Sequence, residues 1–524
     1  MPVRCLLKRS TYYDSVALMQ AAREVARLPG VAEAAVVMAT AANLALLRQA
    51  GLVGTEIATA GPNDLVIAVR ATDEAVADQA LRAAEQALVR RVGPVTAAAG
   101  RPRALRAAHH AHPESNLAVI SVPGPYAAAE AWEALRLGLH VFLFSDNVPL
   151  EEEIALKRYA AAHGLLMMGP GCGTAILDGV ALGFGNVLPR GPIGMVSAAG
   201  TGLQEVSTIL ARKGLGLSQG IGTGGRDLSA EVGGVMMRQG LRLLQDDPKT
   251  QVLVLISKPP APRVAASILS ELGSKPAVVC FLGGDAAPIA AAGAIPARTL
   301  EEAAERAAAL LSPSSPKGPA EEEIASLQAH IIQAGRRLQP GQRYLRGLYS
   351  GGTLCAEAQV IWQDMGLRVY SNAPLHPALR LADAAGCRGH YALDLGEEEY
   401  TLGRPHPMID LSLRLQRLRE EAADPEVAAI VLDVVLGYGA HPDPAGELGP
   451  AIYQARAQAA HEGRELLVLA SVTGTEEDPQ RYSRQVRALE QAGAVVAPSN
   501  AAAARLVGGW KLEVGSWKME GGGA

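Results

Sequence analysis

Hydroxyl-bearing residues and glycines stand together where the sequence pattern changes from strand to helix. The stretch from Ile193 to Ser197 has the apolar pattern of a buried strand, and it leads through Ala-Ala-Gly-Thr-Gly into a helical run that begins at Leu203. Glycines let a ligand approach the backbone closely, and the first N–H groups of a helix can bind an anion. We therefore expect this turn to bind phosphate or a similar anion, although a tight turn without a ligand would show the same pattern.

Two further segments have the same composition. One is the glycine cluster that begins at Gly220, and the other follows a strand that ends near Tyr349. None of the three segments has the Gly-Lys-Ser/Thr ending of a Walker loop, so a P-loop nucleotide site is not predicted. The candidate anion-binding residues of the three segments are Ser197, Gly200, Thr201, Gly202, Gly222, Thr223, Gly224, Gly225, Ser350, Gly351, Gly352 and Thr353.

Three ionisable residues are candidates for catalytic roles. Lys258 follows a buried-type strand and precedes two prolines, which would hold its positive charge at the ligand edge. Asp433 closes the strand 427–432, and His441 lies in the loop that follows. Loops at strand ends are where α/β enzymes place acid–base or orienting groups. The alternatives are an exposed lysine, a helix-capping aspartate and a surface histidine.

Parallel strands must position these loops. The runs 117–122, 142–145 and 165–169 are apolar and are separated by helical patterns, which is typical of half of a doubly wound, Rossmann-like sheet. Ligands of such sheets bind at the carboxyl ends of the strands. The residues expected at that edge are Pro123, Gly124, Pro125, Ser145, Asp146 and Asn147.

The alternation of strand and helix patterns predicts an α/β protein of several domains. Residues 313–340 open with a stretch rich in Ser, Pro and charge, which is typical of a linker. The expected order is a small ferredoxin-like α/β module over 1–95, a Rossmann-like domain over 115–185, a flavodoxin-type domain over 190–312, the linker over 313–340, and a second flavodoxin-type domain over 341–524.

Composition excludes several classes of protein. The chain has 524 residues and a net charge of -5, so it lacks the long-range positive field that attracts nucleic acid or an acidic membrane. Every apolar run is interrupted well before about 18 residues, so no membrane span is expected. The five cysteines are widely spaced, which predicts reduced thiols, a cytoplasmic location and no metal site. The basic stretch 93–114 is predicted to be a solvated linker, with binding of phosphate or a metal as the alternative.

The segment 117–311 resembles the α subunit of succinyl-CoA synthetase and the wider group of ADP-forming acyl-CoA synthetases. The resemblance rests on Pro-Gly-Pro after the first strand, Met-Gly-Pro-Gly-Cys-Gly from Met168, Gly-Met-Val-Ser-Ala-Ala-Gly-Thr from Gly194, Gly-Ile-Gly-Thr-Gly-Gly from Gly220 and Gly-Ala-Ile from Gly293. Nearly the whole chain resembles FdrA-type proteins. The resemblance implies a CoA-binding-type domain followed by synthetase-like domains, and it makes the strand-end residues from Pro123 to Asn147 candidates for binding CoA.

Two departures from the synthetases bear on the chemistry. The synthetases phosphorylate a histidine just before the Gly-Ala-Ile motif, but this chain has Ala290, Ala291 and Ala292 there. A glutamate followed by Ile-Gly-Gly, which the synthetases place after a strand, is replaced by Lys258 and two prolines. The phosphohistidine relay is therefore not expected, whereas the anion-binding turns are retained.

The FdrA-type resemblance implies a role in allantoin, or ureide, nitrogen catabolism. It implies a subunit of an oxamate carbamoyltransferase-like enzyme that moves a carbamoyl group between oxalurate and phosphate. The substrate at the glycine turns would then be phosphate or carbamoyl phosphate, and the partners would be other subunits of the same pathway, with a homo-oligomer also considered. One alternative is a CoA ligase that binds CoA, and a second is a scaffold or regulatory subunit without catalytic activity.

Overall fold

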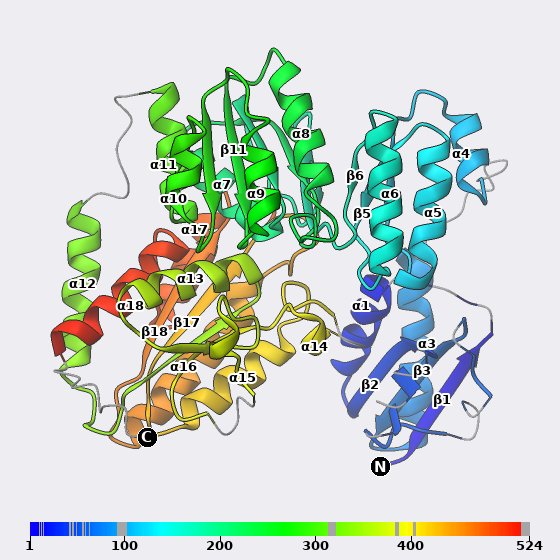
Figure 1. Ribbon diagram of the computed structural model, residues 1–524. Helices are drawn as coiled ribbons and strands as arrows, with labels where there is room; N and C mark the ends of the chain where they lie inside the picture. Colours follow the sequence, from blue (N-terminus) through cyan, green and yellow to red (C-terminus); the bar gives the residue numbers. More distant parts are fainter. Residues whose placement is uncertain are drawn as a thin grey trace. The chain divides into compact units, whose positions relative to one another are not determined.

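The protein forms two compact units, each of which is described by itself (Figure 1). One unit comprises Met1–Arg103 with Thr401–Pro405, and the other comprises Ala104–Tyr400 with His406–Ala524. The computed structural model describes residues 1–9, 11, 13, 15–40, 43–44, 47–48, 50–54, 57, 59–61, 63–91, 102–312, 321–382, 387–401 and 405–514.

The amino-terminal unit is an antiparallel sheet covered by two helices. Its central strand has apolar side chains on both faces: Ile67 and Val69 face one cluster, whereas Val66 and Ala68 face another. The described residues form a three-stranded sheet in the order β1-β3-β2 with two helices, so the N-terminal region is a small α/β module. The elements are β1 (Val3–Lys8), α1 (Ser15–Ala26), β2 (Val31–Met38), β3 (Leu65–Ala71) and α3 (Glu74–Arg91).

The second unit begins with a short helix and a three-stranded parallel sheet in the order β4-β5-β6. Small alanines on one face of α5 let this helix pack closely on the sheet, where Ala127, Ala131 and Ala134 are fully buried. The elements are α4 (Leu105–Ala111), β4 (Leu117–Ile120), α5 (Gly124–Arg136), β5 (His140–Leu143), α6 (Leu150–Ala162) and β6 (Met167–Met168).

A seven-stranded sheet follows, in the order β13-β12-β11-β9-β10-β7-β8. Strand β11 reads Val-Leu-Val-Leu-Ile-Ser and is buried throughout, as expected for a parallel strand with helices on both faces. The hairpin β7–β8 lies within the range 115–185, but it pairs with β10, so this sheet starts at Thr174. The strands are β7 (Thr174–Leu177), β8 (Val180–Gly183), β9 (Arg190–Ser197), β10 (Leu217–Gly222), β11 (Val252–Ser257), β12 (Ala277–Phe281) and β13 (Ile295–Pro296).

Helices cover both faces of the seven-stranded sheet. Alternate residues of each strand face opposite clusters, as Val254 and Leu255 do in β11. The helices are α7 (Gly200–Arg212), α8 (Val235–Asp246), α9 (Pro262–Leu269), α10 (Ala286–Ala291) and α11 (Leu300–Leu311).

The carboxyl-terminal region is a six-stranded, all-parallel sheet in the order β15-β16-β14-β17-β18-β19. Part of the predicted linker is helical, because residues 321–335 form α12, which packs on α18, whereas 313–320 lie outside the described residues. The strands are β14 (Tyr344–Tyr349), β15 (Val369–Ser371), β16 (His390–Asp394), β17 (Val427–Val435), β18 (Leu467–Thr473) and β19 (Val495–Ala497).

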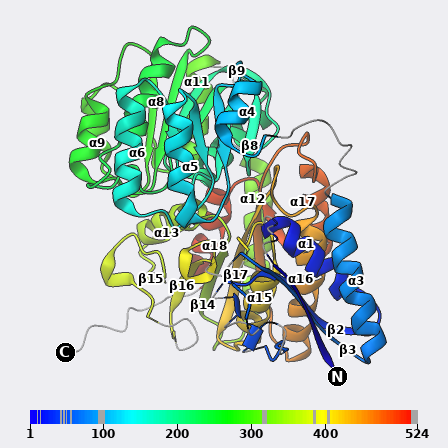
Figure 2. The ribbon, with the colours of Figure 1, turned by 90° about the vertical axis from the view of Figure 1, so that its right-hand side faces the viewer.

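Two groups of helices cover this sheet. Helices α15, α16 and α17 pack against one another on one face, whereas α12, α13 and α18 pack together on the other. Figures 1 and 2 show α13 and α18 between the two large sheets. The helices are α12 (Glu321–Gly335), α13 (Gly352–Asp364), a 3-10 turn (Pro377–Leu379), α14 (Glu398–Thr401), α15 (Ser412–Ala423), α16 (Pro444–His461), α17 (Tyr482–Gln491) and α18 (Asn500–Val514).

One hydrophobic cluster joins the two large sheets. It extends from Ile193 through α7, α13 and α18 to Val507, so the two regions share a core rather than meeting only at their surfaces. The prediction of a multidomain α/β protein with parallel sheets is confirmed. Among the described residues, no helix combines the length and the apolar character that crossing a membrane requires.

Candidate functional site

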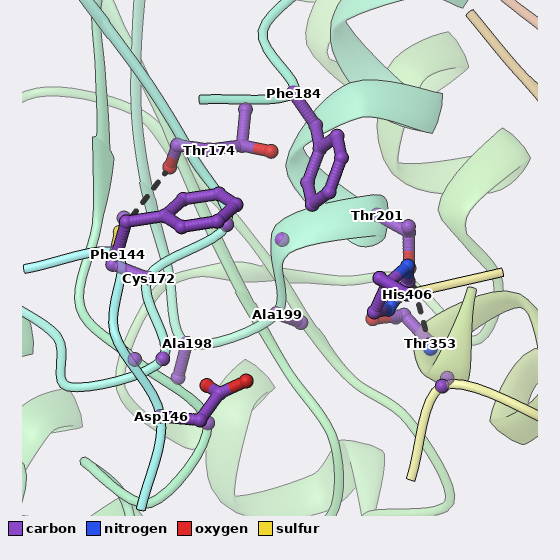
Figure 3. Close-up of a pocket in the computed structure, with 18 of the residues that line it drawn as sticks. Phe144, Asp146, Cys172, Thr174, Phe184, Ala198, Ala199, Thr201, Thr353 and His406 are labelled. Carbon is purple, nitrogen blue, oxygen red and sulfur yellow. Dashed lines mark hydrogen bonds between the residues drawn. The ribbon is translucent and has the colours of Figure 1, made fainter. Parts of the chain in front are cut away.

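A cavity of about 420 Å³ lies at the carboxyl ends of strands from both large sheets. Ser197 and Gly222 end β9 and β10, Ser350 follows β14, and Asp394 ends β16. The loops after β5 and β6 add further lining residues (Figure 3). Because ligands of parallel sheets bind at this edge, the cavity is the candidate functional site.

Two helix N-termini meet at this cavity. The backbone N–H of Thr353, in the first turn of α13, donates to Oγ1 of Thr201 in the first turn of α7 at 3.3 Å. A Cβ added to Gly202 would lie 3.0 Å from Cγ2 of Thr353, and one added to Gly351 would lie 2.9 Å from Cγ2 of Thr201. Glycine therefore allows the two helix ends to approach, and their dipoles together favour an anion.

The glycines near the cavity are required for different structural reasons. A Cβ on Gly200 would meet no atom closer than 3.7 Å, and one on Gly225 would meet none within 4 Å, so these two leave open space for a ligand. A Cβ on Gly222 would clash with the carbonyl of Thr174. Gly224 has φ +87, which favours glycine. The last two glycines are thus explained by packing and backbone conformation.

Most of the predicted anion-binding residues line the cavity, but several have other partners. Gly202, Thr223 and Gly351 are outside the lining. Oγ of Ser197 donates to the carbonyl of Ala199 at 2.7 Å, so this hydroxyl stabilises the turn. The residues of the predicted set that line the cavity are Ser197, Gly200, Thr201, Gly222, Gly224, Gly225, Ser350, Gly352 and Thr353.

Lys258 lies in the cavity, next to the start of α13. Its Nζ is 3.6 Å from Oδ2 of Asp394 and 3.4 Å from Oε1 of Glu397, and its side chain is 40% exposed. Burial works against the charged form, but the carboxylates of Asp394 and Glu397 outweigh it and raise the pKa of Lys258. A Cβ on Gly352 would lie 2.8 Å from Nζ. The same position is closer still to Oδ2 of Asp394, so the ammonium group reaches the α13 N-terminus as an ion pair with that carboxylate.

Asp394 is a site residue that the sequence analysis did not identify, because strand β16 was not predicted. Its Oδ1 accepts a hydrogen bond from the backbone N–H of Gly396 at 3.0 Å. Burial raises the pKa of Asp394 to about 6, although Lys258 opposes this rise. Asp394 is therefore a carboxyl group that can change protonation near neutral pH, beside the lysine that would neutralise an anion.

His406 is a second site residue that the sequence did not reveal. Its ring lies 5.4 Å from the ring of Phe184, and both line the cavity (Figure 3). Burial, with a smaller contribution from Arg414, lowers the pKa of His406 to about 4, so the imidazole is neutral at pH 7. A His-Pro pair in a turn has no period or spacing that would mark it as part of a site.

Asp433 binds the turn that precedes α13 and is not part of the cavity lining. Its carboxylate accepts hydrogen bonds from N of Ser350 at 2.8 Å, Oγ of Ser350 at 3.0 Å and N of Gly351 at 2.7 Å. Nη2 of the buried Arg414 lies 2.9 Å from its Oδ1. These contacts favour an orienting role over direct acid–base chemistry.

His441 also lies outside the cavity lining, and its side chain is 4% exposed. Nδ1 accepts from N of Asp443 at 3.1 Å, and Nε2 is 3.6 Å from a carboxylate oxygen of Glu447. The backbone N–H of His441 donates to the carbonyl of Met408 at 2.7 Å. His441 thereby supports the loop that carries His406.

The residues predicted at the edge of the small parallel sheet divide into two groups. Asp146 and Asn147 line the cavity, whereas Pro123, Gly124, Pro125 and Ser145 do not. Oγ of Ser145 donates to the carbonyl of Val122 at 2.5 Å, and a Cβ on Gly124 would clash with the carbonyl of Asp146. Burial and then Glu398 raise the pKa of Asp146, and both carboxyl groups line this end of the cavity.

A buried lysine fixes the second glycine segment. Nζ of Lys157, fully buried on α6, lies 2.8 Å from Oε1 of Glu153 and 2.9 Å from Oδ1 of Asp227. It also donates to the carbonyl of Thr223 at 2.9 Å. This network joins α6 to the loop after β10 and so sets the position of Gly224 and Gly225.

Two buried carboxylates lie behind the facing helix ends, on the same two helices. Glu357 of α13 accepts from N of Leu300 at 2.6 Å and from Nδ2 of Asn500 at 2.7 Å. Glu205 of α7 accepts from N of Asn500 at 3.0 Å. Burial first, and Glu205 second, raise the pKa of Glu357 to about 8.

Replacing Glu357 with glutamine is expected to change how stability depends on pH. The pKa of Glu357 is raised from 4.5 in the unfolded chain to about 8 in the folded protein. The folded protein therefore holds this proton more tightly than the unfolded chain. The resulting contribution to the free energy of unfolding is complete below pH 4.5 and is lost as the pH rises to about 8. Relative to the wild type, Glu357→Gln should therefore gain free energy of unfolding between pH 5.5 and 8.5, measured by denaturant unfolding. The exposed Glu477→Gln is the control, and an equal difference at every pH would contradict this assignment.

Comparison with known protein families agrees with this architecture. Residues 348–509 match the profile described as CoA-ligase, and residues 1–101 match the profile described as AllF, heavy metal-associated domain. The fold and these matches therefore define a multidomain α/β protein with a CoA-ligase-like domain. The Escherichia coli (strain K12) protein YahF is 45% identical over 505 residues, which cover 95% of this chain and 97% of YahF. The chain belongs to the AllF/YahF-type, FdrA-like family, and the predicted resemblance is confirmed.

The relation to succinyl-CoA synthetase covers a shorter part of the chain. The α subunit 2 of ADP-forming succinate–CoA ligase from Archaeoglobus fulgidus is 31% identical over 229 residues, or 42% of this chain and 78% of that subunit. The α subunit from Staphylococcus epidermidis is 31% identical over 180 residues, or 33% of this chain and 58% of that subunit. Among solved structures, PH0766 from Pyrococcus horikoshii matches at 15% identity and a TM-score of 0.29, covering 76% of this chain and 85% of that one.

The residues of the amino-terminal module do not fit a heavy-metal site. Soft metals bind thiolate, thioether and imidazole ligands, but residues 1–101 contain one cysteine, Cys5, and no histidine, so a Cys-X-X-Cys or Cys/His ligand set is absent from this sequence segment. Sγ of Cys5 points to the carbonyl of Leu52 at 3.9 Å. Over the described residues of the whole chain, no three His, Cys, Asp or Glu side chains are grouped to hold a metal ion.

Proposed function

We propose that this protein is the phosphate-binding subunit of an oxamate carbamoyltransferase-like enzyme of allantoin, or ureide, nitrogen catabolism. It would transfer a carbamoyl group between oxalurate and phosphate without a phosphohistidine. The observation that carries the proposal is the convergence of two helix N-termini and Lys258 on one cavity. The segment where the synthetases carry the phosphohistidine, Ala290 to Ala292 in this chain, lies at the end of α10 and outside the cavity lining.

The residues of the cavity suit a phosphate that enters and leaves as a substrate. The positive ends of the α7 and α13 helix dipoles lie at the cavity, and Lys258 offers a compact positive charge. In the reaction, a phosphate oxygen attacks the carbamoyl carbon of oxalurate and the bond from that carbon to nitrogen breaks. The proton of hydrogen phosphate passes to the departing oxamate nitrogen, so the products are oxamate and carbamoyl phosphate.

Partner subunits are part of the proposal. Once phosphate occupies the helix N-termini, the remaining charged groups of the lining are mainly carboxylates, among them Asp146, Glu397 and Glu398. Oxalurate and oxamate are anions, so this lining would repel their carboxylates. A partner that supplies positive charge at the mouth of the cavity would complete the site.

A CoA ligase is the second candidate function, and the CoA-ligase profile over 348–509 favours it. CoA would need groups that bind its phosphates near the small parallel sheet. Nε of Arg226, the cation at that end, lies 2.8 Å from a carboxylate oxygen of Glu153, and Asp146 and Glu398 are acidic. The lining at this end therefore fits the phosphates of CoA less well than the helix N-termini fit a single phosphate.

A carbamoyl-transfer assay distinguishes the candidates. We expect turnover of oxamate with carbamoyl phosphate when the full chain is combined with its partner proteins, and binding of phosphate by the chain alone in calorimetry. Formation of an acyl-CoA thioester, without carbamoyl transfer in any combination, would replace the proposal with the CoA ligase. Binding of neither phosphate nor CoA would leave the scaffold as the better description.

A further inference from the structure

Three histidines of the carboxyl-terminal region share one local geometry. His376, His406 and His441 each precede a proline, and in each case Nδ1 accepts the backbone N–H of the residue two positions later. Proline has no N–H, so the next residue supplies the first donor of the turn, and the imidazole binds it. For His406 this bond comes from Met408 at 3.2 Å.

This bond determines which nitrogen of His406 carries the proton. A nitrogen that accepts an N–H bond must offer its lone pair, so a neutral His406 carries its proton on Nε2. Burial keeps the ring neutral, because it lowers the pKa of His406 to about 4. A Cβ on Gly396 would lie 2.8 Å from Nε2 of His406. Gly396 lines the cavity, so its lack of a side chain keeps the space in front of Nε2 open.

The groups around His406 agree with a neutral ring. Phe184 lies against it, and Arg414, behind it, disfavours a second positive charge. Asp394 and Lys258 line the same cavity and pair with each other at 3.6 Å. His406 is therefore an uncharged donor in a cavity that also contains two helix N-termini and Lys258.

We propose that His406 is a catalytic residue that donates its Nε2–H to the carbonyl oxygen of the carbamoyl group, while the helix N-termini and Lys258 hold the phosphate. This inference rests on the proposed function and identifies the ligand class of the cavity as a carbamoyl or acyl phosphate. Nε2 carries a proton and has no lone pair, so His406 does not replace the missing phosphohistidine. It remains a donor throughout the reaction.

In the transfer step, a phosphate oxygen bonds to the carbamoyl carbon, and negative charge develops on the carbonyl oxygen. The hydrogen bond from His406 stabilises that charge without transferring its proton. As the carbon–nitrogen bond breaks, the proton of hydrogen phosphate goes to the departing nitrogen and the carbonyl is restored. Neither an oxidant nor a phosphoenzyme is required.

Two ligands test the inference by calorimetry with the full chain. Inorganic phosphate has only the phosphate part, whereas phosphonoacetamide is a stable analogue that also has the amide carbonyl. His406→Ala should lower the affinity for phosphonoacetamide by about tenfold, because one hydrogen bond is lost. It should change the affinity for phosphate by less than about twofold. His406→Gln should restore most of the affinity, because its side-chain N–H can reach the position of Nε2.

His376→Ala is the matched control, because exposed His376 has the same His-Pro turn outside the cavity lining. It should leave both affinities unchanged. Equal weakening of both ligands by His406→Ala, or no weakening of either, would overturn the role at the carbonyl. A phosphorylated His406 found by mass spectrometry after incubation with carbamoyl phosphate would overturn it as well. If the wild type binds neither ligand, the proposed function itself fails, and with it this inference.

Discussion

Replacing Lys258 with methionine is expected to weaken phosphate binding by about 10- to 100-fold, the loss of one charge-assisted hydrogen bond. Methionine retains most of the apolar stem but removes the charge beside the α13 N-terminus. It also leaves Asp394 and Glu397, each within 3.6 Å of Nζ in the wild type, facing the bound anion. Calorimetry with inorganic phosphate at pH 7.5 measures the effect.

Two further variants show whether the effect belongs to this site. Lys249→Met removes the same charge from an exposed position, 3.8 Å from Asp178, and should leave phosphate affinity unchanged. Lys258→Met combined with Asp394→Asn should bind phosphate better than Lys258→Met alone, because the repelling carboxylate is gone. An unchanged affinity in Lys258→Met would remove Lys258 from the site.

Much of the site could be predicted because its backbone is encoded locally. A strand followed by glycines, a threonine and a helix identified the turns at Gly200 and Gly352 from the sequence. Lys258 was identifiable because lysine is unusual directly after a buried strand. That the two turns meet across a single cavity depends on the shared core of the two large sheets, and no local pattern contains that information.

The residues that were missed depend on tertiary structure. Strand β16 reads His-Tyr-Ala-Leu-Asp, which is short and polar at both ends, so its sequence does not indicate a buried strand. The sequence therefore gives no sign that Asp394, at the end of this strand, lies beside Lys258. His406 is defined by a turn and by Phe184, more than 200 residues earlier. Lys157 lies within a helix, and only the fold shows that its ammonium group reaches the carbonyl of Thr223.

The sequence could not decide between acid–base and orienting roles for Asp433 and His441, and both lie outside the cavity lining. A carboxylate at a strand end has the same pattern whether it faces a ligand or binds the neighbouring turn. In the structure, the donors on Asp433 come from Ser350, Gly351 and Arg414. A substitution at Asp433 tells the two roles apart. It should lower the free energy of unfolding if Asp433 supports the turn, and it should lower turnover if Asp433 acts in acid–base chemistry.

Asp433→Ala is expected to cost about 3–5 kcal/mol of unfolding free energy, because it leaves a buried charge without its partner. Arg414 is 2% exposed, and its Nη2 lies 2.9 Å from Oδ1 of Asp433. The N–H groups of Ser350 and Gly351 would also lose their acceptor. Amide hydrogen exchange should increase over 344–364, and denaturant unfolding of the full chain should shift to lower concentration.

Arg414→Met with Asp433→Leu is the matched double variant. It removes both charges, so it should recover part of the stability lost in Asp433→Ala, since replacing a buried ion pair with apolar residues costs less than breaking it. Asp433→Asn retains one acceptor oxygen and should be intermediate. If Asp433→Asn instead folds like the wild type and binds phosphate normally but loses turnover, Asp433 acts in the chemistry, and the supporting role derived from its contacts is wrong.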